Sequence, residues 1–395
     1  MQISPETQLF IREHQTDDVR ALALQARKYP NVDMPTAITQ IAGRQVAAEK
    51  IPSWREIEEI WYPKHLSLEQ CSSEITARYK ARLFQGDSLT DLTGGFGIDC
   101  SFLATGFKSA TYVERQEELC EIAAHNFPIL NLNHINVRNE DGVAYLQTMS
   151  PVDCIFLDPA RRNEHGGKTV AISDCEPNVA ELEALLLSKA NRVMIKLSPM
   201  LDLSLALKEL KHTQEIHILS VNNECKELLI LLRQTSPAEI AIHCVNLLTK
   251  GTQEEQHLVF TREQEQRSQC TYTDSLGNYL YEPNASLLKA GAFRSIAAAY
   301  PVRKLHPNSH LYTSDSFIEN FPGRIFRIVN QCSFNKKEVK ENLADLKKAN
   351  VTVRNFPATV AELRKRLHLT EGGDTYLFAS TLNNGQKVII RCEKV

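Results

Sequence analysis

A glycine-rich turn and three acids, each at the end of a predicted strand, are the residues of this sequence best suited to chemistry. The turn reads Asp91-Leu-Thr-Gly-Gly-Phe-Gly97 and leads into a predicted helix, so its backbone could approach an anionic ligand closely. Glu114 follows the second strand, where it could accept both hydroxyls of a ribose. Asp141 follows the third strand, where it could accept the exocyclic amine of adenine, and Asp158 ends the fourth. Together they predict a nucleoside site.

These residues can meet only if the segments that carry them alternate as parallel strands and helices. From residue 87 the hydrophobic pattern predicts that alternation, with helices over 98–105, 117–126 and 179–189. Strands are predicted over 88–92, 110–113, 135–138, 152–157 and 192–197, followed by a hairpin that pairs 215–221 with 227–232. The series predicts an α/β fold with a Rossmann-like, doubly wound and mostly parallel sheet.

The residues before the sheet, 1–86, are predicted to be helical because glycine is nearly absent and apolar residues recur at helical spacing. The clearest segment is predicted as one helix over 66–84, with Ser67 as its N-cap. One face of that helix is polar and carries Glu69, Gln70, Ser72, Ser73 and Thr76. Two interpretations stay open for this face: contact with solvent, or a wall of the neighbouring site, in which Glu69 and Gln70 would bind substrate.

Two smaller domains are predicted after the sheet domain, which is assigned to residues 87–236. Residues 237–321 are expected to form a small α+β domain, and residues 322–395 a compact β-α-β-α-β-β domain. Residues 323–395 hold 14 Lys and Arg against 7 Asp and Glu, a charge of +7, whereas the preceding residues hold 31 against 41. A basic tail domain on an acidic body points to a polyanionic partner.

Composition excludes several classes of protein. With 43% hydrophobic and 24% charged residues, the 395-residue chain is neither collagen-like nor disordered. No apolar run approaches the ~18–20 residues of a membrane span, and the polar N-terminus does not resemble a secretory signal, so we expect a cytoplasmic protein without membrane contact. The ten cysteines form no C-x-x-C pair, which argues against a zinc ribbon or redox motif, and no metal site is expected.

The ordered series of glycine turn and acids resembles the class I S-adenosylmethionine (SAM)-dependent methyltransferases over roughly residues 87–233. The resemblance implies SAM as cofactor. It also implies a role for each matching residue. Asp91, Thr93, Gly94, Gly95 and Gly97 would hold the methionine part, Glu114 the ribose and Asp141 the adenine, while Asp158 would lie beside the reacting methyl group.

The motif Asp158-Pro-Ala-Arg161 bears on the substrate. Amino methyltransferases that act on nucleobases often have Asn/Asp-Pro-Pro-aromatic here, and RNA uracil-C5 methyltransferases have Asp-Pro-Pro-Arg. The latter also need a cysteine after the fifth strand, where this chain has Lys196-Leu-Ser-Pro199, so a covalent route is disfavoured. We predict Asp158, Pro159 and Arg161 as catalytic, and Arg161, Arg162 and Lys196 as contacts to phosphate or base.

The wider sequence resembles one family, the bacterial class I methyltransferases with a C-terminal THUMP-like domain, found in Bacteroidetes. The segments that carry this resemblance are Leu68–Glu74, Asp91–Asp99, Tyr112–Arg115, Leu157–Arg162, Glu224–Glu227 and Tyr281–Asn284. It implies a ferredoxin-like insert at 237–321 and a THUMP-like domain at 322–395. THUMP domains bind RNA, which agrees with the basic charge of this end of the chain.

The sequence therefore favours methyl transfer from SAM to RNA, and the expected acceptor is a base nitrogen of rRNA or tRNA. The RNA backbone would be held by Lys336, Lys337, Lys340, Lys347, Lys348, Arg364, Lys365 and Arg366. Three other hypotheses stay open: methylation of a protein or small molecule, RNA binding without catalysis, and a dehydrogenase using NAD.

Overall fold

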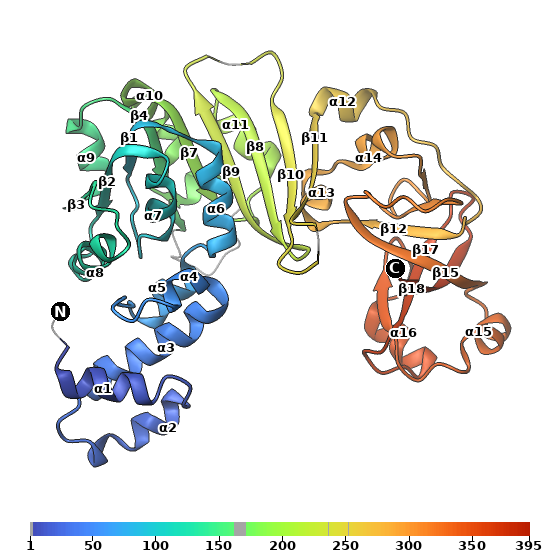
Figure 1. Cartoon of the computed structure of the whole chain (residues 1–395). Helices are drawn as coiled ribbons and strands as arrows, with labels where there is room; N and C mark the ends of the chain where they lie inside the picture. The colour runs from blue at the N-terminus through green and yellow to red at the C-terminus, as the bar shows by residue number, and fades with distance from the viewer. Residues whose placement is uncertain (1–2, 162–170, 236, 252) are drawn as a thin grey trace. The chain divides into compact units, whose positions relative to one another are not determined.

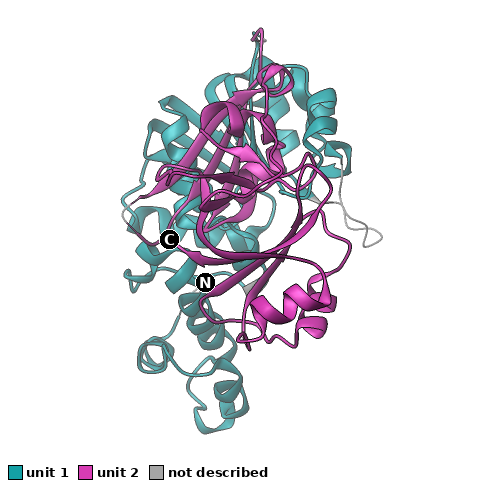
Figure 2. Ribbon diagram, turned by 90° about the vertical axis from the view of Figure 1, so that its right-hand side faces the viewer, with its two compact units in different colours: residues 1–214, 229–236 teal, residues 215–228, 237–395 magenta. Residues whose placement is uncertain are grey.

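Two units divide the chain, and Figure 2 colours them separately. The first comprises residues 1–214 and 229–236, and the second residues 215–228 and 237–395. The computed structural model describes residues 3–161, 171–235, 237–251 and 253–395. In that part of the chain, no helix is both long enough and apolar enough to cross a lipid bilayer.

Short helices form the N-terminal part of the first unit (Figure 1, blue). They are α1 (Pro5–Glu13), α2 (Val19–Leu24), the 3₁₀ helix η1 (Ala26–Lys28), α3 (Met34–Lys50), α4 (Pro52–Arg55), α5 (His65–Gln70) and α6 (Glu74–Leu83). Asp18 and Asp33 cap α2 and α3 by accepting backbone N–H groups. The prediction of one helix over 66–84 was wrong, because the chain leaves the helix at 71–73, where Ser72 donates a hydrogen bond to Asp99 in the helix after the glycine turn.

The sheet of the first unit contains β1 (Gly86–Asp91), β2 (Phe107–Glu114), β3 (Ile135–Asn139), β4 (Val152–Leu157) and β7 (Ala190–Leu197). These strands are parallel and lie in the order β3-β2-β1-β4-β7, which confirms the doubly wound sheet. Residues 154–157 and 193–197 are all buried, as expected for central strands covered on both faces.

Helices cover the two faces of this sheet, and they are α7 (Ile98–Ala104), α8 (Glu117–Ile129), α9 (Gly142–Thr148), α10 (Val179–Lys189) and α11 (Leu203–Glu209). Ala77 of α6, Ile98 of α7 and Ile122 of α8 share one hydrophobic core, while α9 packs against α10. Right-handed crossovers that move along the sheet in opposite directions place their helices on opposite faces. Short elements complete this region: β5 (Ala160–Arg161), η2 (Ile172–Asp174) and β6 (Cys175–Glu176).

The predicted hairpin consists of β8 (Thr213–Val221) and β9 (Glu224–Arg233). Its residues 215–228 begin the second unit, while 213–214 and 229–233 belong to the first. Asn222 and Asn223 make the turn with φ values of 48° and 70°, a conformation that asparagine tolerates. β10 (Ala241–Leu247) pairs with β8 in parallel, and β11 (Glu255–Thr261) pairs with β10 antiparallel. The helix α12 (Arg262–Arg267) follows.

A second sheet, in the order β13-β14-β12-β15-β18-β17-β16, forms the rest of this unit. Its strands are β12 (Tyr279–Pro283), β13 (Arg303–Lys304), β14 (Tyr312–Ser314), β15 (Gly323–Ser333), β16 (Asn350–Val353), β17 (Thr375–Thr381) and β18 (Lys387–Lys394). Its helices are α13 (Ala285–Ala290), α14 (Phe293–Ala299), α15 (Lys336–Leu343) and α16 (Val360–Leu367). Gly291 separates α13 from α14, since its φ of 75° ends α13.

Candidate active site

The strand order reverses between β1 and β4, and the candidate site lies at the carboxyl ends of these two strands. Open α/β sheets bind ligands at such a switch point, because the neighbouring crossovers leave in opposite directions. Asp91, the last residue of β1, is paired in register with Phe156 of β4, so Asp158 follows two residues beyond. Thr93 Oγ1 accepts the backbone N–H of Asp158 at 2.6 Å, which ties the glycine turn to the end of β4.

The glycine turn is shaped by close approaches that a side chain would block. A Cβ on Gly94 would lie 2.2 Å from Cε2 of Tyr112, and Gly97 has a φ of 87° where α7 begins. A Cβ on Gly142 would lie 2.1 Å from the carbonyl oxygen of Leu92. Gly142 therefore lets the loop after β3 pack directly on the backbone of the turn, and Asp141 comes beside it.

Glu114 is buried against the glycine turn. Its Oε2 accepts the Gly95 N–H at 3.0 Å, and its Oε1 accepts the Gln116 N–H at 2.9 Å. Asp141 caps α9, since its Oδ1 accepts the N–H groups of Val143 and Ala144 at 3.0 Å each. Each carboxylate is thus fixed in orientation by the backbone, and a carboxylate has further lone pairs with which to accept hydrogen bonds from a nucleoside.

Asp91 is 1% exposed, and its Oδ2 has no hydrogen-bond partner among the described residues. Its Oδ1 accepts the Thr93 N–H at 3.0 Å. Burial raises the pKa of Asp91 well above its ordinary value, and the carboxylates of Asp99 and Asp158 add to the rise. A buried acceptor without a partner is costly in the free protein and suits a cationic ligand.

Two lysines and two aspartates join around a serine beside Asp91, and we call Ser72, Lys80, Asp99, Asp158 and Lys196 the lysine–aspartate cluster. Lys196 Nζ lies 2.6 Å from Asp158 Oδ2 and 3.3 Å from Asp99 Oδ2. Lys80 Nζ lies 2.9 Å from Asp99 Oδ1. Ser72 Oγ accepts from both lysines and donates to Asp99 at 2.7 Å.

The two aspartates of the cluster are held at different pKa values. Burial would raise the pKa of Asp99, but Lys80 and Lys196 outweigh it and lower that pKa to about 2. Burial raises the pKa of Asp158 above its ordinary value, and Lys196 opposes this rise. The side chain of Asp158 is 37% exposed against 10% for Asp99, so Asp158 is the acid of the cluster that a substrate can reach.

The remaining predicted residues fall in different surroundings. Pro159 is buried directly after β4, and the backbone of Arg161 pairs with Cys175 of β6. The side chain of Arg161 and the whole of Arg162 lie outside the described residues. Glu69 and Gln70 are exposed at the end of α5, whereas Ser72 of the same polar face enters the cluster.

Sequence reasoning missed Lys80 and Asp99 and gave Lys196 a different setting. Lys196 is 8% exposed and paired with two aspartates, so its contact with phosphate or base stays a prediction. Asp99 lies two residues beyond the glycine turn and ends the segment Asp91–Asp99, which carries the family resemblance. No role was predicted for Asp99 itself. Lys80 comes four residues after Thr76 and seven after Ser73, so it continues the predicted polar face of its helix. The extension of that face to a lysine was the available signal.

In the second unit, the predicted basic residues lie on α15, on α16 and in the segment between α15 and β16. Exposed side chains belong to Lys336, Lys337, Lys340, Lys347, Lys348, Lys365 and Arg366. Arg364 is half-buried and pairs with Glu371, and the guanidinium of Arg366 lies 4.0 Å from the ring centre of Phe334. This end of the chain thus presents a cationic surface.

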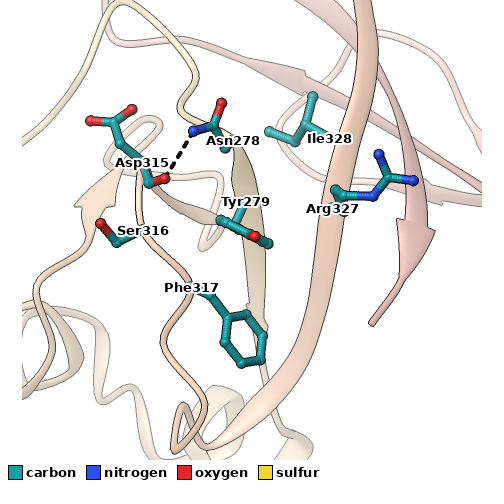
Figure 3. Close-up of a pocket in the computed structure, with 7 residues that line it drawn as sticks. All are labelled: Asn278, Tyr279, Asp315, Ser316, Phe317, Arg327 and Ile328. Atoms are coloured by element: carbon teal, nitrogen blue, oxygen red, sulfur yellow. Dashed lines mark hydrogen bonds between the residues drawn. The ribbon is translucent and has the colours of Figure 1, made fainter.

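An open pocket of about 560 Å³ lies on the second sheet (Figure 3). Asn278, Tyr279, Asp315, Ser316, Phe317, Arg327 and Ile328 line it. Phe317 is 44% exposed, and its ring lies 5.5 Å from that of Tyr279. An exposed phenylalanine ring with a tyrosine and an arginine beside it offers surfaces on which unpaired nucleobases can stack.

Comparison with known proteins places this chain beside one close relative. A crystal structure from Porphyromonas gingivalis W83, named as that of a methyltransferase, shares 35% identity over 98% of this chain and 97% of its own, with a TM-score of 0.87. Family models match a ferredoxin-like domain at residues 279–322 and a THUMP domain-like region at residues 323–394.

More distant structures also match. An rRNA methylase from Streptococcus thermophilus has 13% identity over 40% of this chain and 94% of its own, with a TM-score of 0.30. A Streptococcus mutans protein solved with S-adenosylhomocysteine has 12% identity over 40% and 96%, also with a TM-score of 0.30. Similarity this low carries no argument about function. The comparison with curated proteins gave no match.

Proposed function

The chain belongs to the bacterial class I SAM-dependent methyltransferases that carry a C-terminal THUMP-like domain, and from this premise we propose that it methylates RNA. The observation that carries the proposal is the meeting of Asp91, Glu114 and Asp158 around one glycine turn at the switch point of the sheet. The proposal assigns the residues around the turn to SAM and the surface of the second unit to RNA.

The residues at the turn fit SAM because their carboxylate oxygens can accept further hydrogen bonds. Asp91 Oδ2 is a buried acceptor that lacks a partner among the described residues, and it would take the ammonium of the methionine part. Glu114 would accept from the ribose hydroxyls, and Asp141 from the adenine amine. When bound, SAM supplies an electrophilic methyl group on a sulfonium.

Asp158 would orient the acceptor. Its Oδ2 is committed to Lys196 at 2.6 Å, so Oδ1 is the oxygen left to accept a hydrogen from an exocyclic amine. Such a bond would aim the nitrogen lone pair at the methyl group, and alignment supplies most of the acceleration in a transfer that needs little acid–base help. Pro159 would border the same acceptor, and contacts from Arg161 and Arg162 to phosphate or base stay a prediction from the sequence.

The second unit supports RNA as the acceptor. It combines the cationic surface of α15 and α16 with the aromatic rings of the open pocket in Figure 3. Backbone phosphates bind such cations without regard to sequence, and splayed bases stack on exposed rings. We infer an rRNA or tRNA target with a base nitrogen as the methyl acceptor.

Nucleoside mass spectrometry of rRNA and tRNA tests this function. A strain that lacks the gene should lose one methylated nucleoside, and the purified protein with tritiated SAM should restore it to that RNA. Complementation with an Asp158→Ala variant is the matched control and should fail. Unchanged nucleosides, together with methyl incorporation into RNase-treated lysate, would instead assign a protein or small-molecule acceptor.

The affinity for SAM should depend on pH through Asp91. Because its pKa is raised in the free protein, an ammonium ligand must bind the ionised form and release a proton, so affinity should rise with pH up to that raised pKa and then level off. Asp91→Asn should weaken binding by about 1.5–3 kcal/mol and lose this pH dependence. Calorimetry across pH, in buffers of differing ionisation enthalpy, measures both. A variant that keeps the wild-type pH profile would contradict the assignment.

RNA affinity should fall steeply with salt. Replacing Lys336, Lys337 and Lys340 of α15 by glutamine should reduce the slope of log K against log salt by about 2, since each phosphate contact to a single strand contributes about 0.7. The matched control changes Lys64, Lys108 and Lys208, three exposed lysines of the first unit, and should leave the slope unchanged. Filter binding between about 50 and 200 mM salt gives the slopes. Equal slopes in both triple variants would remove α15 from the RNA surface.

A further inference from the structure

Histidines gather on one face of the strands β8 and β10 and on their neighbour β11. Glu215 and His217 are two residues apart on β8 and therefore share a face. His243 of β10 is the register partner of His217. His257 of β11 is the partner of Val245, two residues along β10 from His243, so it lies on that face too.

The distances within this group match those of a metal site. One ligand atom each from Glu215, His217 and His243 lies within 4.8 Å of the others. Glu215 Oε2 is 3.3 Å from His217 Nε2 and 4.0 Å from His243 Nε2. Donors on a tetrahedral zinc ion with bonds of ~2.0–2.1 Å are separated by about 3.3–3.4 Å. The rings of His217 and His243 are stacked, with centroids 4.3 Å apart and planes at 11°, so binding requires the two rings to rotate until their nitrogen lone pairs converge on the ion.

The outer side of His243 is already held. Its Nδ1 lies 3.2 Å from Nε2 of His257, while its Nε2 faces Glu215. Histidine ligands of metals characteristically use the second ring nitrogen in a hydrogen bond that fixes the tautomer and the ring orientation. His257 occupies that position, and the arrangement thus contains both a donor set and its outer support.

We propose that Glu215, His217 and His243 bind a divalent transition metal ion, with zinc as the ion that fits best, and that His257 positions His243. Two imidazoles and one carboxylate form a donor set of the kind that leaves a further coordination position open to water. The ion would join β8 to β10, two strands that are far apart in sequence. This site is separate from the residues assigned to methyl transfer.

Burial and charge agree with a ligand role. The side chain of His217 is 2% exposed and that of Glu215 is 38% exposed, so the group is anchored in the protein and open to solvent on one side. Glu215 brings a carboxylate beside both imidazoles, and it supplies the negative charge that favours a divalent cation at this place.

Metal titration of the full-length protein tests the proposal. After treatment with a chelator, the protein should bind one equivalent of Zn²⁺ by calorimetry, and Co²⁺ in its place should give a visible d–d absorption. His243→Asn should weaken Zn²⁺ binding at least 100-fold. His257→Ala should weaken it about 10- to 100-fold, as expected for loss of an outer hydrogen-bond partner.

The control variant is His368→Asn, which removes an exposed histidine from the C-cap of α16, where φ is 54° and asparagine is tolerated. It should bind Zn²⁺ as the wild type does. His257 is exposed, so its variant should fold, and circular dichroism with the thermal midpoint checks this for each protein. The ten free cysteines are the main competing ligands, and they would reveal themselves by a thiolate-to-Co²⁺ charge-transfer band.

Two results would overturn the assignment. One is wild-type affinity in a folded His243→Asn protein. The other is binding that carries the thiolate band or is absent altogether. A metal-dependent rise in the thermal midpoint that His243→Asn abolishes and His368→Asn retains would support it without any measurement of methyl transfer.

Discussion

Replacing Lys80 with methionine is expected to lower the free energy of unfolding by about 3–5 kcal/mol, the cost of removing one partner from a buried ion pair. The side chain of Lys80 is 0% exposed and that of its partner Asp99 is 10% exposed. Methionine keeps much of the volume of the stem, so the loss reports on the charge that is left behind at Asp99. Urea unfolding followed by circular dichroism gives the free energy.

A second substitution separates charge from packing. In Lys80→Met the carboxylate of Asp99 keeps Lys196 but loses the nearer of its two lysines. Because Asp99→Asn removes that buried charge while retaining an acceptor for Ser72, the double variant Lys80→Met/Asp99→Asn should recover part of the stability lost by Lys80→Met. The surface pair of Lys108 and Asp87, 80% and 73% exposed, supplies the control, and Lys108→Met should leave the unfolding midpoint unchanged. Equal losses from the single and double variants would show that packing, not charge, explains the effect.

The pH dependence of stability has a definite sign at Asp99. Its folded pKa of about 2 lies below its unfolded value near 3.9, so its ion pairs contribute stability that is complete above about pH 4 and lost as pH falls toward 2. Lys80→Met should flatten this part of the acid unfolding curve. Asp91 and Asp158 have raised pKa values and therefore act in the opposite direction over a higher pH range.

The strands and the positions of the acids at their ends could be predicted from the sequence, because the hydrophobic pattern determines the strands and the parallel topology determines where they end. A run of apolar residues such as 152–157 must be a strand covered on both faces, and the carboxyl ends of parallel strands lie at one edge of the sheet. Glu114 and Asp141 then fall beside the glycine turn by topology alone. Gly142 adds a second constraint, since the packing of its loop on Leu92 excludes any side chain.

The lysine–aspartate cluster could not be predicted from the hydrophobic pattern of the sequence. Its members come from α6, α7 and β7, from the residue after β4 and from the break at 71–73. A hydrophobic period of three or four residues does not predict that break. Lys196 illustrates the consequence. A lysine near the end of a strand suggests a phosphate contact, yet here two aspartates from other elements lie beside it. Pairings of this kind depend on tertiary packing.

The histidine group on β8, β10 and β11 could not be predicted from the sequence either. A search for metal motifs that begins with cysteine spacing finds nothing, and metal binding was accordingly not expected. Glu215 and His217 have the spacing of a strand face, but only the register of β8 with β10 brings His243 opposite His217. Register between distant strands was the missing information.

Glu114→Ala is expected to reduce SAM affinity by about 1.5–3 kcal/mol, roughly 10- to 150-fold, as for a hydrogen bond to a charged group. Glu114 is 8% exposed and bound to Gly95 N–H and Gln116 N–H. Its removal would therefore delete the proposed ribose acceptor and also release the turn. Isothermal calorimetry with SAM measures the total effect of both.

A deoxyribose analogue of S-adenosylhomocysteine distinguishes these two effects. If Glu114 accepts from the ribose, the analogue should bind the wild type more weakly than S-adenosylhomocysteine does, and this difference should vanish in Glu114→Ala. Glu114→Gln, which keeps one acceptor for the backbone, should retain more affinity than the alanine variant. If instead the analogue loses equal affinity in wild type and variant, the carboxylate acts by shaping the turn, because a direct hydrogen bond cannot be lost from a side chain that is no longer present.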